Sequence, residues 1–378
     1  MTSTPAAPSG PTAAHPHDHW MAEALALAHQ AIALSDPNPR VGCVIVADDG
    51  QVIGRGHTQQ AGGPHAEVMA LHDAAQRGHS VRGATVVVTL EPCAHHGRTA
   101  PCCDALTAAG VARVVMAVED PNPLVAGQGA ARLRASGIEV LSGIGAEAAR
   151  ELNIGFFSRM LRQRPWVRLK IAASLDGRTA LQNGVSQWIT GEAARTDGHA
   201  WRRRAGAVLT GVGTVTEDNP RLDVRLVPTP RQPLRVVVDS RLDAPLDARI
   251  FDAPGSALVY AANPGAERHA AFTARGIEVA LAPGPTDKVD LVALLADLAG
   301  RGINELHVEA GHKLNGSFVR ERLVDEYLIY LAPKLLGAGR DMAAFGPLTE
   351  LSDALALQFH QVDRVGDDLR VLARPVPD

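Results

Sequence analysis

The feature that most constrains the fold is a group of four side chains carried by separate segments of the chain. His65 and Glu67, one residue apart, open a segment with helical spacing of apolar residues, EVMALHDAAQR. Cys93 follows a proline and the apolar run ATVVVTL, which is typical of a buried strand, and Cys102 comes nine residues later. An imidazole and two thiolates are ligands that Zn²⁺ prefers, and His-x-Glu followed by Pro-Cys is a zinc-deaminase signature. The chain is therefore expected to bring a helix start and a strand end together around one metal ion.

The spacing of the cysteines decides which of them can serve as ligands. The sequence departs from the usual Cys-x-x-Cys spacing, so the second thiolate must come from Cys102 or Cys103. We predict Cys102, because it would begin a helix over residues 102–109, and a helix N-terminus stabilises a thiolate. His65, Cys93 and Cys102 would leave the fourth zinc position open for water, whose pKa zinc lowers to about 7. Glu67 would then act as the general acid and base.

Several neighbouring residues allow more than one interpretation. The long loop after Cys93 carries His95 and Arg98, which could contact a polar or phosphorylated substrate. Asn38, in a Pro-Asn-Pro segment, is a candidate for hydrogen-bonding the substrate base, although such a segment also forms a simple turn. A structural zinc site closed by His95 or Cys103 is the alternative to a catalytic one, but it leaves the position of Glu67 unexplained.

The length of 378 residues predicts two domains. Strands alternate with helices after an opening hairpin, which indicates a three-layer α/β domain with a mixed sheet, and a second α/β domain starts at the strand WVRLKIAAS. The expected division is a disordered tail over residues 1–18, a deaminase domain over 19–160, a linker over 161–166 and a second domain over 167–378.

Composition narrows the partners and the compartment. The net charge of -4 and the 4% aromatic residues argue against general binding of nucleic acid. No apolar run approaches the roughly 20 residues of a membrane span, and the N-terminus lacks the pattern of a secretory signal. Only four cysteines occur, three of them within a short loop, which favours metal binding in a reducing compartment, the cytoplasm.

The second half lacks the GxGxxG pattern of a Rossmann fold. It has instead glycines at two strand ends, in GVGT from Gly211 and in EAG from Glu309. Glycines there let backbone N–H groups approach a phosphate, although plain turns use them too. Lys170 and Asp218 are the candidates for polarising or protonating the reacting group of a substrate.

The chain closely resembles the bifunctional deaminase-reductases of riboflavin biosynthesis. The resemblance rests on the segments PNPRVGCVIV, GGPHAEVMAL, TLEPCAHHGRTAPCCDAL, DPNPLVAGQG, LKIAASLDGRTA, SQWITG, GVGTVTEDNPRLDVR, VVVDSR and VEAGHKLNGSF. It implies a zinc-dependent hydrolytic deamination of a phosphoribosylamino-diaminopyrimidinone, followed by NADPH-dependent reduction of the ribosyl group to ribityl. It also implies a cytidine deaminase-like first domain, a dihydrofolate reductase-like second domain and a homo-oligomer.

The resemblance assigns residues in the second domain. The implied NADPH contacts are Ala172, Trp188, Thr214, Asp218, Ser240, Gly311, His312, Lys313, Leu314, Asn315, Gly316 and Ser317. The implied substrate contacts are Ser186, Arg202, Leu222, Arg225 and Glu309. The competing hypothesis is a transfer-RNA deaminase whose second domain binds RNA, because its zinc site would look much the same.

Overall fold

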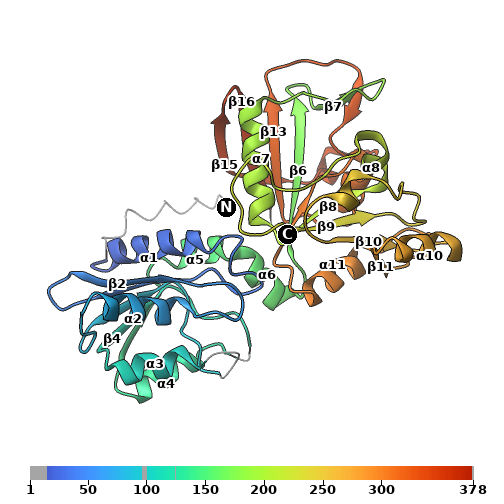
Figure 1. Cartoon of the computed structure of the whole chain (residues 1–378). Coiled ribbons are helices and arrows are strands. Elements are labelled where there is room, and N and C mark those ends of the chain that lie inside the picture. The colour runs from blue at the N-terminus through green and yellow to red at the C-terminus, as the bar shows by residue number, and fades with distance from the viewer. Residues whose placement is uncertain (1–14, 96–99, 124, 377–378) are drawn as a thin grey trace, which may run out of the picture. The chain divides into compact units, whose positions relative to one another are not determined.

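The computed structural model describes residues 15–95, 100–123 and 125–376. The chain forms two compact units, one made of the chain through Ala31 together with Pro39–Asn153, the other of Ile32–Asn38 together with the chain from Ile154 onward. Figure 1 shows a sheet with helices against it in each unit. Most of the predicted disordered tail lies outside the described residues, and the other domain boundaries stay predictions. Within the predicted linker, helix α6 (Ile154–Arg162) extends to residue 162.

The first unit contains a five-stranded mixed sheet. Its strand order is β2 (Val52–His57), β1 (Gly42–Val46), β3 (Thr85–Val88), β4 (Arg113–Met116) and β5 (Glu139–Ser142). β1 pairs antiparallel with β2 and β3, whereas β3, β4 and β5 are parallel. Helices α1 (Asp18–Gln30) and α5 (Ala146–Leu152) cover one face, and α2 (Ala66–Gln76), α3 (Cys102–Ala109) and α4 (Gln128–Ala135) cover the other (Figure 1).

Glycines let the helices approach this sheet closely. A Cβ on Gly42 would lie 1.9 Å from the carbonyl oxygen of Ala24 in α1. On the opposite face, a Cβ on Gly56 would lie 2.3 Å from the carbonyl oxygen of Ala66, the first residue of α2. The hairpin therefore fixes where α2 begins.

The second unit contains a nine-stranded sheet. Its order is β11 (Glu278–Leu281), β10 (Ala257–Ala261), β9 (Leu234–Val238), β8 (Ala207–Gly211), β12 (Glu305–Val308), β6 (Trp166–Ser174), β13 (Glu326–Ala332), β16 (Asp368–Pro375) and β15 (Leu357–Val365). All pairs from β11 to β13 are parallel, and the last two strands pair antiparallel. A separate two-stranded ribbon joins β7 (Arg178–Leu181) to β14 (Gly339–Asp341).

Helices cover both faces of the large sheet. The main core lies under α11 (Leu291–Gly300) and α12 (His312–Arg320). The other face is covered by α8 (Val212–Asp218), α9 (Arg249–Asp252) and α10 (Ala266–Ala274), and by α7 (Glu192–Arg204) over the strands near β13 (Figure 1). A 3-10 turn spans Leu351–Asp353. Among the described residues, no helix is long and apolar enough to cross a membrane.

Candidate functional site

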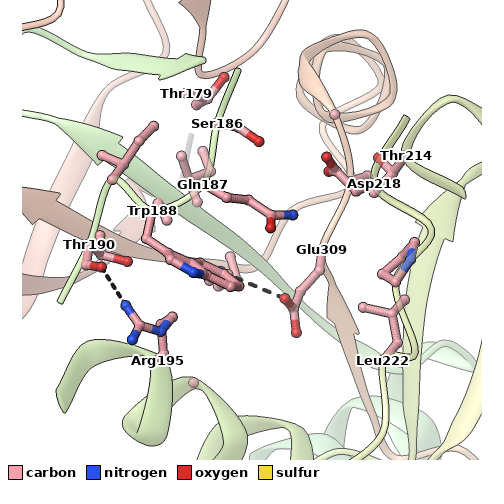
Figure 2. A pocket seen from close by; sticks show the side chains of 18 of the residues that line it. Thr179, Ser186, Gln187, Trp188, Thr190, Arg195, Thr214, Asp218, Leu222 and Glu309 are labelled. Carbon is pink, nitrogen blue, oxygen red and sulfur yellow. Dashed lines mark hydrogen bonds and ion pairs between the residues drawn. The ribbon is translucent and has the colours of Figure 1, made fainter. Parts of the chain in front are cut away.

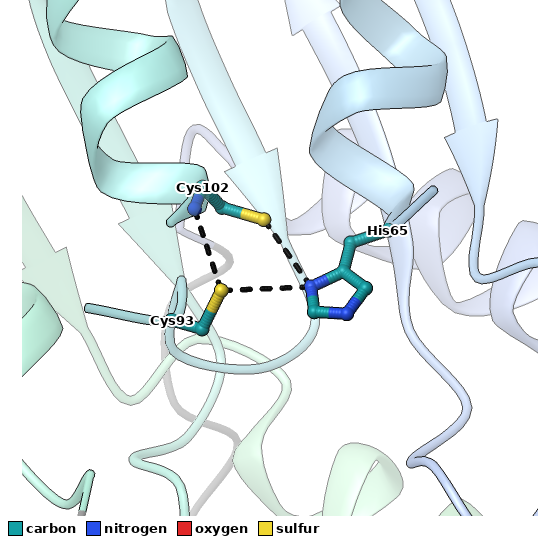
Figure 3. Close-up of side chains that lie close together, drawn as sticks. All are labelled: His65, Cys93 and Cys102. Carbon is teal, nitrogen blue, oxygen red and sulfur yellow. Dashed lines mark hydrogen bonds between the residues drawn. The ribbon is translucent and has the colours of Figure 1, made fainter. Parts of the chain in front are cut away.

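The predicted metal ligands gather at one point of the first unit (Figure 3). His65 immediately precedes α2, Cys93 lies in the loop after β3, and Cys102 begins α3. The Nδ1 atom of His65 lies 3.5 Å from Sγ of Cys93 and 3.3 Å from Sγ of Cys102. All three ligand atoms lie within 4.8 Å of one another, which is the compact nitrogen and sulfur donor set that suits Zn²⁺.

The N-terminus of α3 stabilises the sulfur of Cys93, whereas we predicted that it would stabilise the sulfur of Cys102. The backbone N–H of Cys102 donates to Sγ of Cys93 at 3.3 Å, so the first amide of α3 stabilises Cys93 rather than Cys102. A hydrogen bond with the Cys102 thiol lowers the pKa of Cys93. The same hydrogen bond raises the pKa of Cys102.

Glu67 lies on the first turn of α2, buried to 3% exposure. Burial, together with the neighbouring Cys93 sulfur, raises the pKa of Glu67 to about 7. A carboxyl group with that pKa exchanges a proton readily near neutral pH, which is the property a general acid and base requires.

The remaining residues around the metal group have different positions. Cys103 is outside the group, and its thiol lies 3.3 Å from the carbonyl oxygen of Pro92. His95 is exposed, and Arg98 lies outside the described residues. Asn38 belongs to the segment that groups with the second unit, where its N–H donates to the carbonyl of Ser35 at 2.9 Å.

The second unit contains a pocket of about 510 Å³ (Figure 2). Most of the predicted reductase residues line it: Lys170, Ala172, Ser186, Trp188, Arg202, Thr214, Asp218, Leu222, Arg225, Glu309, Gly311, His312 and Asn315. Gly211 and Gly311 are the N-caps of α8 and α12, so each predicted glycine turn leads into a helix at the pocket wall. Burial, with the charge of Glu217, raises the pKa of Asp218.

Five predicted cofactor contacts do not line this pocket: Ser240, Lys313, Leu314, Gly316 and Ser317. Ser240 follows β9, and its hydroxyl accepts a hydrogen bond from the N–H of Val289 at 3.2 Å. The other four lie on α12, and a Cβ on Gly316 would lie 2.0 Å from the carbonyl oxygen of Ala344. The close approach of the Ala344 backbone therefore explains why residue 316 is a glycine.

Arg202 and Glu309, both predicted substrate contacts, bind each other. Arg202 donates through Nε and NH2 to the two carboxylate oxygens of Glu309, and through NH1 to the carbonyl of Asp223 at 3.0 Å. Although burial alone would raise it, the charges of Arg202 and of Lys170, 3.6 Å away, hold the pKa of Glu309 well below its usual range. Arg225 is half exposed, so it is the better placed of the two predicted arginines to meet a phosphate.

Sequence reasoning missed several residues of the pocket. Arg195 and His199 line it from α7, on the same face as Arg202. Their spacing of four and three residues is a helical signal that could have found them. The Arg195 guanidinium stacks over the ring of Trp188 at 4.7 Å and donates to the carbonyl of Thr190 at 2.8 Å (Figure 2). It thereby supports an aromatic side chain that is 62% exposed.

Each of the two units matches a known protein family. The family described as "Cytidine and deoxycytidylate deaminase zinc-binding region" matches residues 14–118, and the one described as "RibD C-terminal domain" matches residues 165–371. "Riboflavin biosynthesis protein RibD" of Escherichia coli is 45% identical to the chain, over 93% of this chain and 97% of the relative. The corresponding protein of Aquifex aeolicus is 40% identical, over 93% and 96%.

Solved structures agree with the sequence relatives. RibD of Acinetobacter baumannii superposes with a TM-score of 0.85 at 41% identity, covering 95% of this chain and 99% of that one. A Thermotoga maritima protein, titled a diaminohydroxyphosphoribosylaminopyrimidine deaminase/5-amino-6-(5-phosphoribosylamino)uracil reductase, superposes with a TM-score of 0.85 at 33% identity, covering 95% and 99%. The predicted fold class, a deaminase-like α/β domain followed by a reductase α/β domain, is confirmed. The chain belongs to the RibD family of bifunctional deaminase-reductases of riboflavin biosynthesis.

Proposed function

We propose that the first unit hydrolyses the amino group of diaminohydroxyphosphoribosylaminopyrimidine, and that the second reduces 5-amino-6-(5-phosphoribosylamino)uracil, the two activities named for the Thermotoga maritima protein. The observation that carries the proposal is the convergence of His65, Cys93 and Cys102 with Glu67 buried beside them. The domains would correspond to residues 19–160 and 167–378, joined by a linker over 161–166.

In the deaminase, His65, Cys93 and Cys102 would hold one zinc ion. When bound, zinc would supply a Lewis acid that lowers the pKa of water, so that hydroxide forms near neutral pH. The Glu67 carboxylate would take a proton from the attacking water and deliver it to the departing nitrogen, so that water and the amine become a carbonyl and ammonia. Among the described residues only three ligands gather, which supports a fourth position left for water over a closed structural site.

In the reductase, NADPH would supply the hydride that converts the ribosyl group to ribityl. The predicted NADPH contacts that line the pocket and the substrate contacts Ser186, Arg225 and Glu309 would bring the two molecules together there. Burial raises the pKa of Asp218, which would favour proton donation to the sugar oxygen, and Lys170 would supply positive charge in the same pocket.

We further propose that the partners are these small molecules alone, without nucleic acid, and that copies of the chain associate, as the resemblance implies. Free cysteines around a zinc site fit a reducing compartment, so we propose the cytoplasm.

Glu67→Gln tests the deaminase assignment. The variant should keep one zinc ion per chain, because Glu67 is not a ligand, and lose ammonia release by roughly 10²–10⁴-fold, the usual contribution of a general acid and base. Zinc content by atomic absorption and ammonia release are measured on the same sample. Loss of the metal together with activity would make Glu67 a ligand and overturn its proposed role.

A further inference from the structure

Glu91 is a buried carboxylate that the proposed chemistry does not use. It lies two residues before Cys93 and is 4% exposed. Three backbone N–H groups donate to its side chain: that of Asp120 at 3.1 Å, that of Gly127 at 3.0 Å and that of Ala130 at 3.0 Å. Its own N–H donates to the carbonyl of Val118 at 2.9 Å. Glu91 therefore holds a segment that lies 29 to 39 residues further along the chain.

Two of these donors belong to the N-terminus of α4. Gly127 is the N-cap of this helix and has no side chain with which to cap it, and Ala130 is the third residue of the helix. A carboxylate that accepts N–H groups there supplies the cap and interacts favourably with the helix dipole. Glu91, which lies with Cys93 in the loop after β3, therefore caps the N-terminus of α4.

The first turn of α4 packs directly against the chain on the N-terminal side of Cys93. A Cβ on Gly129 would lie 2.0 Å from the carbonyl oxygen of Pro92 and 3.1 Å from Cγ of Glu91. The thiol of Cys103 lies 3.3 Å from the carbonyl of Pro92 and 3.5 Å from that of Gly129. Cys103, the residue after Cys102, therefore packs where Gly129 of α4 contacts Pro92.

Arg132, one turn further along α4, contacts the chain on the other side of Cys93. Its NH1 donates to the carbonyl of Ala94 at 2.9 Å, and its NH2 lies 2.6 Å from the carboxylate of Asp104 in the first turn of α3. Helix α4 thus touches the residues on both sides of one sulfur ligand and the helix turn that carries the other.

We propose that Glu91 is a positioning residue of the deaminase: by capping α4 it fixes the helix against the loop, and so sets where the two sulfur ligands stand. This inference rests on the proposed zinc site. Residues that orient metal ligands typically change metal affinity or activity by about 10–100-fold when replaced.

Glu91→Gln in the full-length chain is the direct test. Glutamine keeps the size and one acceptor oxygen, but it removes the negative charge and turns an NH2 group toward at least one of the three backbone N–H donors, so the cap is weakened. We expect zinc to be lost to a chelator at roughly 10–100-fold lower chelator concentration. Amide hydrogens of residues 118–123 and 125–130 should exchange faster, and in the Co²⁺-substituted protein the thiolate-to-metal absorption bands should shift. Glu139→Gln, which changes an exposed carboxylate on β5, is the matched control and should leave all three readouts as in the wild type.

The outcomes separate the two claims. If the wild-type chain binds no zinc through the two cysteines, the proposed site fails. If it does, and Glu91→Gln retains zinc, amide protection and cobalt spectrum as in the wild type, the positioning role is refuted. If Glu91→Gln does not fold, Arg132→Met is the alternative variant, because the Arg132 side chain is 44% exposed. It removes the contacts of α4 with the Ala94 carbonyl and the Asp104 carboxylate. It should weaken zinc retention and shift the same cobalt bands, and unchanged bands would refute the role of α4.

Discussion

His199 lies in the wall of the reductase pocket, on the same helix as Arg202. Its Nδ1 accepts a hydrogen bond from the backbone N–H of Arg225 at 3.2 Å, which requires the ring nitrogen to be unprotonated. Burial, together with the positive charges of Arg202 and Arg225, lowers the pKa of His199 to about 4. The histidine is therefore a neutral acceptor that holds the start of the Arg225 loop.

This pKa predicts how stability depends on pH. The unfolded chain takes up the proton at pH about 6.5, whereas the folded chain resists it down to about 4, so stability is full above 6.5 and falls as the pH is lowered between these values. One such group contributes at most about 1.4 kcal/mol per pH unit. His199→Asn places an acceptor where Nδ1 was and cannot titrate, so its unfolding free energy should fall less steeply between pH 6.5 and 5.

Chemical denaturation at several pH values measures this slope. Burial also lowers the pKa of His307, which contributes with the same sign and remains in the variant, so the slope should decrease without disappearing. His360→Asn, at an exposed position on β15, is the control. An identical pH slope in His199→Asn and the wild type would contradict the assignment.

At the scale of residues, the sequence was most informative where chemistry restricts the residue type. His65, Cys93 and Cys102 were predicted together because few sites other than metal centres need that set at that spacing. The cap at Glu91 could not be predicted, because its partners are backbone N–H groups that carry no residue-specific signal. The pairing of Arg202 with Glu309 was missed for a related reason, since spacing alone does not say which strand lies opposite α7.

At the scale of elements, the β1–β2 hairpin sets the position of the helix that begins just after His65. Gly56→Ala tests this, because the added Cβ would lie 2.3 Å from backbone of α2, and the backbone cannot move aside without moving the helix. We expect a destabilisation of about 1–3 kcal/mol, the usual cost of overpacking, and a lower zinc content, because the ligand His65 immediately precedes α2.

Thermal unfolding and zinc analysis of the purified variant check the expectation. Gly300→Ala is the control, since a Cβ at Gly300, the last residue of α11, meets no atom within 4 Å and should be tolerated. A Gly56→Ala protein with wild-type melting temperature and zinc content would show that the hairpin does not position α2.

Buried periodic segments were predicted well and exposed ones poorly. The helix expected over residues 102–109 is α3, and the strand WVRLKIAAS is β6. β15 was not predicted, because it is exposed along most of its length and lacks the alternation of a half-buried strand. β16 is an exception, because it was missed although it contains no exposed residue. Helix α6 falls largely where the sequence changes to a basic, proline-terminated segment, which resembled a linker more than a helix.

At the scale of the whole molecule, the two sites draw on different units. Every residue that lines the reductase pocket lies between Lys170 and Arg340, in the second unit, whereas the metal group lies wholly in the first. The second unit also includes Ile32–Asn38, where the Asn304 side chain donates a hydrogen bond to Asp36 at 3.1 Å. No single boundary in the sequence therefore separates the two structural units. The sequence could not predict that residues 32–38 belong to the second unit, because a short segment without hydrophobic periodicity does not indicate which domain it packs against.

The most direct test of two consecutive reactions follows ammonia and NADPH together in one sample of the zinc-loaded chain supplied with the diaminopyrimidine substrate. Ammonia should appear first and NADPH should then be oxidised mole for mole. Removing zinc with a chelator should stop both, and adding the deaminated uracil compound should restore NADPH oxidation without ammonia, because the reductase pocket contains none of the metal ligands. NADPH oxidation that proceeds on the diaminopyrimidine without ammonia release, or ammonia release that survives zinc removal, would contradict the account.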